Sequence, residues 1–158
     1  MFLTPDHLDI LTRLAVAVAL GGLIGLEREA HGKEAGFRTY ALVSLGSALI
    51  MIVSAQVYEI YQSRGADVDP SRIAAQVVSG IGFLGAGAII RFQRGVKGIT
   101  TAAGIWVSAG IGLACGLRQY FPAVVTTVFV LIVLVIFTKV DDFFAAKTKK
   151  DDHEPFEG

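Results

Sequence analysis

Five long apolar stretches, separated by short charged segments, determine which folds this chain can adopt. A helix that crosses the hydrocarbon core of a bilayer needs roughly 20 mostly apolar residues, and each stretch is about that long. Because a helix satisfies its backbone hydrogen bonds internally, such stretches predict membrane-spanning helices. They extend from about Leu8 to Leu26, Thr39 to Tyr61, Ile73 to Ile90, Ile99 to Leu117 and Phe121 to Val140.

The composition excludes a soluble globular protein. Of the 158 residues, 53% are hydrophobic and 18% are charged, and the mean hydropathy is +0.60. The formal net charge of +0 gives no basis for a nucleic-acid partner, so the partner implied first is the lipid bilayer. We therefore expect an all-α polytopic membrane helix bundle over residues 1–140, followed by a short charged cytoplasmic tail over residues 141–158.

The distribution of basic residues predicts the orientation of the bundle, because Lys and Arg are retained on the cytoplasmic side. If all five stretches span the membrane, ten bases lie on one side and three on the other. This asymmetry predicts an external N-terminus and a cytoplasmic C-terminus. The ten are Arg28, Lys33, Arg38, Arg91, Arg94, Lys97, Lys139, Lys147, Lys149 and Lys150, and the three are Arg64, Arg72 and Arg118. Arg13 lies inside the first stretch four residues after Asp9, and we expect these two to pair.

The segment "GLEREAHGKEAGFRTYAL", Gly25 to Leu42, is dense in charge although apolar stretches flank it. One interpretation is a solvated helical extension that turns at Gly36, since its charges are spaced i,i+4. The other notes that Glu27 and Arg28 follow the apolar run directly, where charge is costly unless paired. We hypothesise a cytoplasmic polar cluster that couples the bundle to a regulatory partner; the alternative is a set of unrelated interfacial anchors. Its members would be Glu27, Arg28, Arg38, Thr39, Arg91 and Thr101.

Small residues predict how the helices pack, because backbones in lipid approach closely where side chains are small. The fourth stretch carries an unbroken ridge of four small residues, and the third is rich in glycine on more than one side. The fifth stretch has no small stripe, so we expect it to be peripheral. The expected packing residues are Gly80, Gly82, Gly85 and Gly87 on the third stretch, and Gly104, Ser108, Gly112 and Gly116 on the fourth.

Other polar residues leave two functions open. An alternative to a regulatory protein is a small ion or solute transporter, with a path between the third and fourth helices lined by Gln76, Ser79, Thr100, Thr101 and Ser108. We favour packing for Gln76, through a hydrogen bond to the fourth helix. The sequence has no nucleophile-plus-base motif or phosphate-binding loop, so we expect neither an enzyme nor a cofactor. Asp67, Asp69 and Ser71 form either a solvated turn or a divalent-cation site, so metal binding stays open.

Three segments carry a family resemblance: "GGLIGLEREAHGKEAGFRTYALVSLGSAL", "RIAAQVVSGIGFLGAGAIIR" and "GITTAAGIWVSAGIGLACGL". They resemble the successive signature blocks of the MgtC/SapB family of bacterial inner-membrane proteins, over about Gly21 to Leu117. The resemblance implies a protein for adaptation to low magnesium, acid or intracellular stress, which bears on virulence. It further implies action by modulating an F-type ATP synthase or a P-type cation ATPase. A homo-oligomer is also expected, and the soluble C-terminal domain of many members is expected to be absent.

Carried over position by position, the resemblance selects residues in all three blocks. Thr100 and Val107 depart from it, since several relatives have Asn at the first position and some have Cys at the second. The selected residues are Glu27, Arg28, Gly36, Arg38 and Thr39, then Gln76, Ser79, Gly80, Gly82, Gly85 and Gly87, then Thr101, Trp106, Ser108, Gly110, Gly112 and Cys115.

Overall fold

In the computed structural model the chain folds into five α-helices and one two-stranded antiparallel hairpin. The structure describes residues 5–65, 69, 71–92 and 95–151, with residues 5, 92 and 138–151 as backbone only. The elements are α1 (Pro5–Ala30), α2 (Phe37–Gln62), α3 (Ser71–Ala88), β1 (Ile90–Phe92), β2 (Gly95–Lys97), α4 (Ile99–Gly116) and α5 (Tyr120–Asp151). The predicted all-α helix bundle is confirmed.

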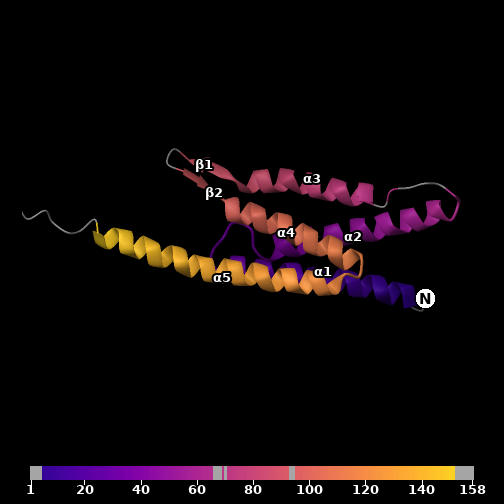
Figure 1. The fold of residues 1–158 in the computed structure, drawn as a ribbon, viewed down its shortest axis with the longest axis horizontal. Coiled ribbons are helices and arrows are strands. Elements are labelled where there is room, and N and C mark those ends of the chain that lie inside the picture. Colours follow the sequence, from indigo (N-terminus) through magenta and orange to yellow (C-terminus); the bar gives the residue numbers. More distant parts are fainter. Residues whose placement is uncertain (1–4, 66–68, 70, 93–94, 152–158) are drawn as a thin grey trace, which may run out of the picture.

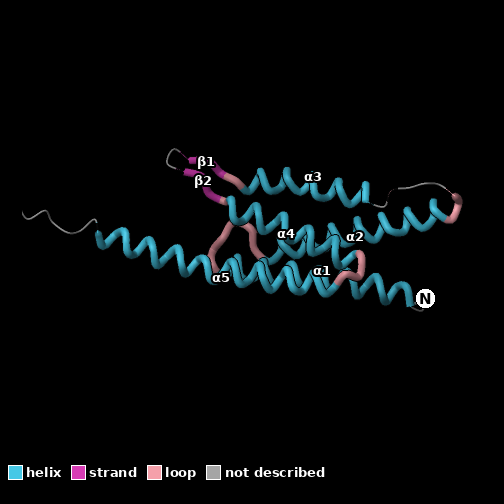
Figure 2. Tube along the Cα trace, viewed as in Figure 1, coloured by secondary structure: helices cyan, strands magenta, loops and turns pink. Residues whose placement is uncertain are grey.

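The helices run up and down side by side along one long axis (Figures 1 and 2). The α1–α2 loop, the β1–β2 hairpin and the C-terminal part of α5 lie at one end, which we call the basic end. The start of α1, the end of α2 and the α4–α5 turn lie at the opposite end. The connections that are rich in Lys and Arg are therefore gathered at the same end of the bundle.

Four of the five helices are long and apolar enough to cross a membrane. They are the segments Asp6–Ala30, Phe37–Gln62, Ile99–Gly116 and Tyr120–Phe137. Helix α3 is the fifth predicted span, and it is not among these four. Its 18 residues include Arg72, Gln76 and four glycines.

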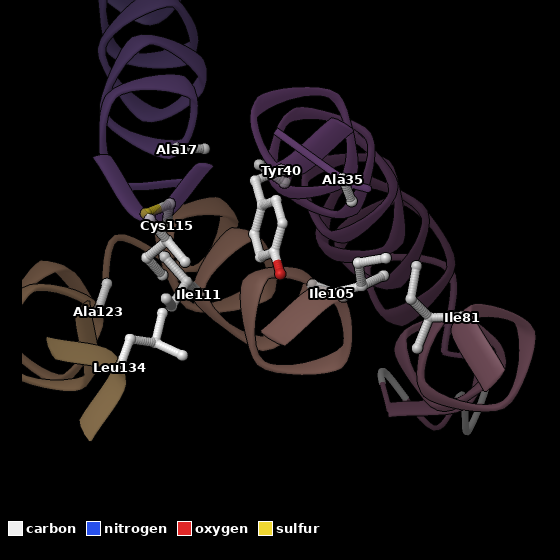
Figure 3. Packing of buried hydrophobic residues seen from close by; sticks show 12 residues of the cluster. Ala17, Ala35, Tyr40, Ile81, Ile105, Ile111, Cys115, Ala123 and Leu134 are labelled. Carbon is white, nitrogen blue, oxygen red and sulfur yellow. The ribbon is translucent and has the colours of Figure 1, made fainter. Parts of the chain in front are cut away.

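Helix α4 is the centre of the bundle, since it contacts all four other helices. Figure 3 shows the core around it: Tyr40 of α2 and Ala17 of α1 lie on one side, and Leu134 of α5 on another. Tyr40 and Cys115 have no exposed surface at all. Because the other four helices surround α4, we expect substitutions on α4 to disturb the packing of the bundle most strongly.

The small residues of α4 pack against α2. A Cβ added at Gly104 would lie 2.5 Å from the Tyr40 Oη, and one at Gly116 would lie 2.7 Å from the Ala48 carbonyl oxygen. At Gly112 it would overlap the Ser44 carbonyl. The two backbones are thus too close for any side chain at these positions, as the predicted ridge requires.

The glycines of α3 differ from the prediction. A Cβ added at Gly80, Gly82 or Gly87 would meet no atom within 4 Å, so these positions do not pack closely against any described helix. Gly85 alone faces α4, where its Cβ would be 3.7 Å from that of Ala102. The physical reason is that α3 lies at the edge of the bundle, and only one side of it meets a neighbour (Figure 1).

Helix α5 is peripheral, as its lack of small residues predicted. Phe121 and Phe129 are 80% and 62% exposed, which suits a surface that faces lipid. The backbone of α5 continues as helix to Asp151, so no break marks the predicted start of the tail at residue 141. Residues 152–158 of that tail lie outside the described residues.

Candidate functional site

The charged end of α1 is folded into the bundle. The side chain of Arg28 is 3% exposed and that of Glu27 is 9% exposed. The Arg28 Nε lies 3.4 Å from one carboxylate oxygen of Glu27, and the His31 Nδ1 lies 3.1 Å from the other. Among the described residues, neither carboxylate oxygen accepts a hydrogen bond with good geometry, and the Arg28 Nε donates none. Burial of a charged pair with so few hydrogen bonds is costly, which marks it as a candidate site.

The backbone turns sooner after this pair than the predicted helical extension requires. Helix α1 ends at Ala30, and Gly32 has a φ of +62°, the left-handed conformation that glycine adopts without strain. The carboxylate of Glu29 instead accepts a hydrogen bond of 2.9 Å from the amide of Phe37 at the start of α2. The interpretation of the segment as a helical extension that turns at Gly36 is therefore wrong. The hydrogen bond between Glu29 and Phe37 instead holds the loop against the start of α2.

Polar bonds join α2 to α4 beside this pair. The Tyr40 hydroxyl donates to the carbonyl of Thr101 over 3.3 Å, and the Ser108 hydroxyl donates to the carbonyl of Tyr40 over 3.0 Å. Thr101 and Ser108 are 4% and 0% exposed. Gly104 leaves room for the Tyr40 ring between these two bonds. Sequence reasoning missed Tyr40, although a tyrosine inside an apolar stretch is a sign of a buried polar partner.

An open cavity of about 690 Å³ lies at the basic end, between the α1–α2 loop and the start of α4. It brings together side chains of both charged connections. Its lining comprises Arg28, Gly32, Lys33, Glu34, Val96, Lys97, Gly98, Ile99, Thr100 and Thr101. The sequence hypothesis did not include Lys33 or Lys97 in the cluster, because both look like ordinary solvated loop residues.

The structure brings together only three of the six residues of the hypothesised cluster. Arg28 and Thr101 line the cavity, and Glu27 is ion-paired to Arg28. Arg38, Thr39 and Arg91 are at the same end of the bundle, but they are exposed and do not line it. Helix α2 turns its Tyr40 side toward α4, so the neighbouring Arg38 and Thr39 point outward.

The intramembrane polar residues do not form one path. Ser108 and Thr101 are buried toward α2, whereas Gln76, Ser79 and Thr100 are exposed. Gln76 lines an apolar groove of about 480 Å³ between α2 and α3, and no bond from it to α4 is found among the described residues. A transport path between α3 and α4 lined by all five is therefore not present in the described structure, because their side chains face different neighbours.

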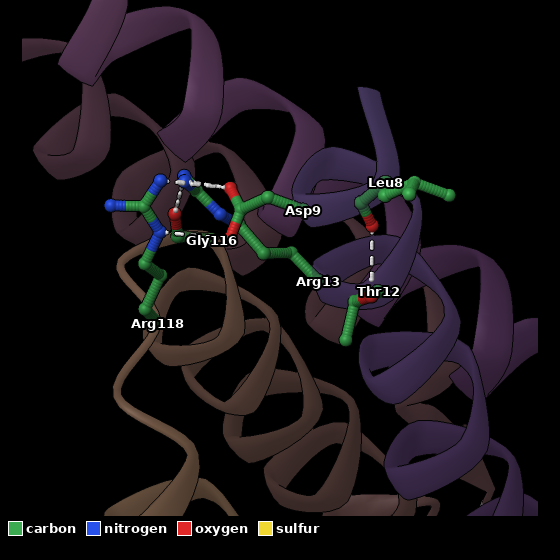
Figure 4. A network of polar contacts seen from close by, with 6 residues as sticks. All are labelled: Leu8, Asp9, Thr12, Arg13, Gly116 and Arg118. Carbon is green, nitrogen blue, oxygen red and sulfur yellow. Dashed lines mark hydrogen bonds and ion pairs between the residues drawn. The ribbon is translucent and has the colours of Figure 1, made fainter. Parts of the chain in front are cut away.

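A second polar network closes the opposite end. Arg13 pairs with Asp9, as predicted, and its Nη1 donates to the Gly116 carbonyl over 3.1 Å (Figure 4). Arg118 makes two bonds of 2.9 Å to the same carboxylate of Asp9, which joins the α4–α5 turn to α1. Arg118 has a φ of +62°, a position at the end of a helix where glycine is usual. The partnership of Asp9 and Arg118 spans 109 residues, so no local pattern predicted it.

Of the three candidate cation ligands, only Asp69 and Ser71 lie among the described residues. No group of three or more His, Cys, Asp or Glu side chains is placed to hold a metal there. The Asp69 carboxylate accepts bonds of 2.8 and 2.7 Å from the amide and hydroxyl of Ser71, and these bonds hold the pKa of Asp69 below its usual value. Asp67 lies outside the described residues.

Together, the apolar helices, the up-and-down bundle and the polar groups at both of its ends define a multi-pass helical membrane protein. A family model described as "MgtC family" matches residues 14–143, which is most of the chain. The chain therefore belongs to the MgtC family.

Curated relatives agree with this assignment. An "Uncharacterized protein" of Haemophilus influenzae is 47% identical over 131 residues, which is 81% of this chain and 55% of that protein. The "Putative magnesium transporter YhiD" of Escherichia coli K12 is 45% identical over 82% of this chain and 60% of its own length. "Protein MgtC" of Salmonella typhimurium LT2 is 45% identical over 83% and 52%. The matches thus span little more than half of these relatives, and no solved structure matches the chain.

Proposed function

We propose that this chain is a regulatory protein of the bacterial inner membrane that supports growth when magnesium is scarce. It acts without catalysis, by modulating another membrane complex such as an F-type ATP synthase or a P-type cation ATPase. Support comes from its membership of the MgtC family and from relatives named "Protein MgtC" and "Putative magnesium transporter YhiD". Adaptation to acid and to life inside host cells belongs to the same proposal.

The observation that carries the proposal is the buried Glu27–Arg28 pair at the basic end. A pair that is more than nine-tenths buried and poorly hydrogen-bonded costs stability, so its presence is best explained by function. It lies beside the α1–α2 loop and the hairpin, whose exposed charged side chains give this end a polar surface that a partner can contact. In the proposed orientation this end faces the cytoplasm.

The test is growth of a strain that lacks the chromosomal gene and carries a plasmid copy, in low-magnesium medium. Glu27→Gln keeps the shape of the side chain and removes its charge, so we expect loss of growth support with normal membrane levels on immunoblots. Arg38→Gln is the matched control, because Arg38 is an exposed charge at the same end, and it should support growth. Equal growth with both variants would contradict a role for the buried pair.

A transporter is the second candidate, because one relative carries that word in its name. Proteoliposomes that contain only this protein separate the two functions. A regulator should show no magnesium flux above that of empty liposomes. Flux that Glu27→Gln abolishes would replace the regulatory proposal by a transport mechanism.

A further inference from the structure

The cavity at the basic end has more basic than acidic side chains in its lining. Three of its lining side chains are cations, Arg28, Lys33 and Lys97, and Glu34 is its one lining acid among the described residues. Glu27 does not line it and instead pairs with Arg28 from the side. With about 690 Å³ of open space, the cavity has room for a phosphate group and part of the molecule that carries it.

The start of α4 adds backbone donors to this cavity. The first amides of any helix lack partners within the helix, and the aligned peptide dipoles make that end positive. In α4 the N-cap is Gly98, which has no side chain to cap these amides, and the next three residues line the cavity. Gly98 has a φ of +89°, and a Cβ there would overlap the carbonyl of Ala88, so the position excludes Ser, Asp or any other capping side chain.

Arg28 is the observation that points to a ligand. A guanidinium carries five N–H donors in a planar fork, yet the contact of the Arg28 Nε to the Glu27 carboxylate, at 3.4 Å, is not a hydrogen bond. The Arg28 residue is 3% exposed, and its Nε is buried without a hydrogen-bond partner among the described residues. Burial of a guanidinium without hydrogen bonds costs free energy, and a ligand with several acceptor oxygens in the cavity would offset this cost by accepting its hydrogen bonds.

We propose that this cavity binds a phosphate-type anion, held by Arg28, by Lys33 and Lys97, and by the first amides of α4. A phosphate group fits this donor set because it offers several oxygens in a tetrahedron, matching a fork, two point charges and a helix N-terminus. The group is carried by a free phosphate or phosphate ester, or by a lipid headgroup at the membrane surface. The inference does not rest on the proposed regulatory function, and its test needs only the purified protein.

The experiment measures thermal unfolding of the full chain in a neutral, phosphate-free detergent. Inorganic phosphate replaces chloride at constant ionic strength, and the midpoint should rise with phosphate and then saturate, because a ligand stabilises the state that binds it. A parallel series adds phosphatidylglycerol or, as its phosphate-free counterpart, diacylglycerol. A shift with inorganic phosphate assigns a free phosphate as the source. A shift with phosphatidylglycerol alone assigns the headgroup.

Two double variants decide whether the effect arises in the cavity. Lys33→Gln with Lys97→Gln changes exposed side chains that line it, and should weaken the apparent affinity by about tenfold or more. Arg38→Gln with Arg91→Gln removes two exposed cations at the same end that do not line it, and should leave the affinity within about twofold. Arg28→Gln should abolish the shift. The proposal is overturned if neither probe shifts the unmodified protein, or if both double variants lose the shift equally.

Discussion

At the scale of the residue, Arg13 and Arg118 share one carboxylate but differ in environment. The Arg13 side chain is 11% exposed, with a buried Nε and a bond to the Gly116 carbonyl, whereas that of Arg118 is 61% exposed. Arg13→Gln should therefore lower the free energy of unfolding by roughly 1.5–3 kcal/mol, the usual contribution of bonds from a charged group. Arg118→Gln should lower the free energy of unfolding by clearly less than Arg13→Gln does, because solvent screens an exposed pair. Chemical denaturation in detergent measures both, and a larger loss with Arg118→Gln would refute this ranking.

At the scale of the element, α3 and α4 use glycine differently. Gly112 faces the α2 backbone, while Gly80 has open space where a side chain would be. Gly112→Leu should thus force α2 and α4 apart and cost more than the 1–3 kcal/mol that is typical of overpacking. Gly80→Leu is the matched control, and should be neutral or stabilising by up to about 1 kcal/mol through helix propensity. Unfolding midpoints and yields after size-exclusion chromatography report the difference. Similar losses from both would show that α3 is packed in the membrane against a surface outside the described monomer.

At the scale of the whole molecule, the arrangement of the helices makes the orientation testable. The α1–α2 loop and the hairpin lie at the same end, and the α4–α5 turn lies at the other (Figure 1). The charge asymmetry predicts that the basic end is cytoplasmic. Single cysteines at Lys33 and Val96 should then be protected from a membrane-impermeant thiol reagent in intact spheroplasts, in a background with Cys115→Ala. A cysteine at Gln119 should be labelled. The reverse pattern would place the Arg28 cavity outside the cell and contradict the proposed orientation.

Hydropathy and charge were sufficient to predict where the helices lie in the chain and that successive helices alternate in direction. Both quantities are sums over neighbouring residues. The ridge at Gly104, Gly112 and Gly116 was also visible, since a four-residue spacing places residues on one helix face. Which helix the ridge meets was decided only by the tertiary structure, because that depends on how α2 and α4 are rotated about their own axes.

For the site, too, the sequence predicted one part and only the tertiary structure decided the rest. Burial of Glu27 and Arg28 could be expected from their position directly after an apolar run, but the outward direction of Arg38 and Arg91 could not. Lys97 lines the same cavity as Arg28 only because the hairpin folds back beside the α1–α2 loop. Arg118 reaches Asp9 only because the α4–α5 turn lies beside the start of α1. The sequence by itself determined where the long apolar helices lie along the chain. The tertiary structure decided which charges share a cavity, because such contacts depend on the positions of residues far apart in the chain.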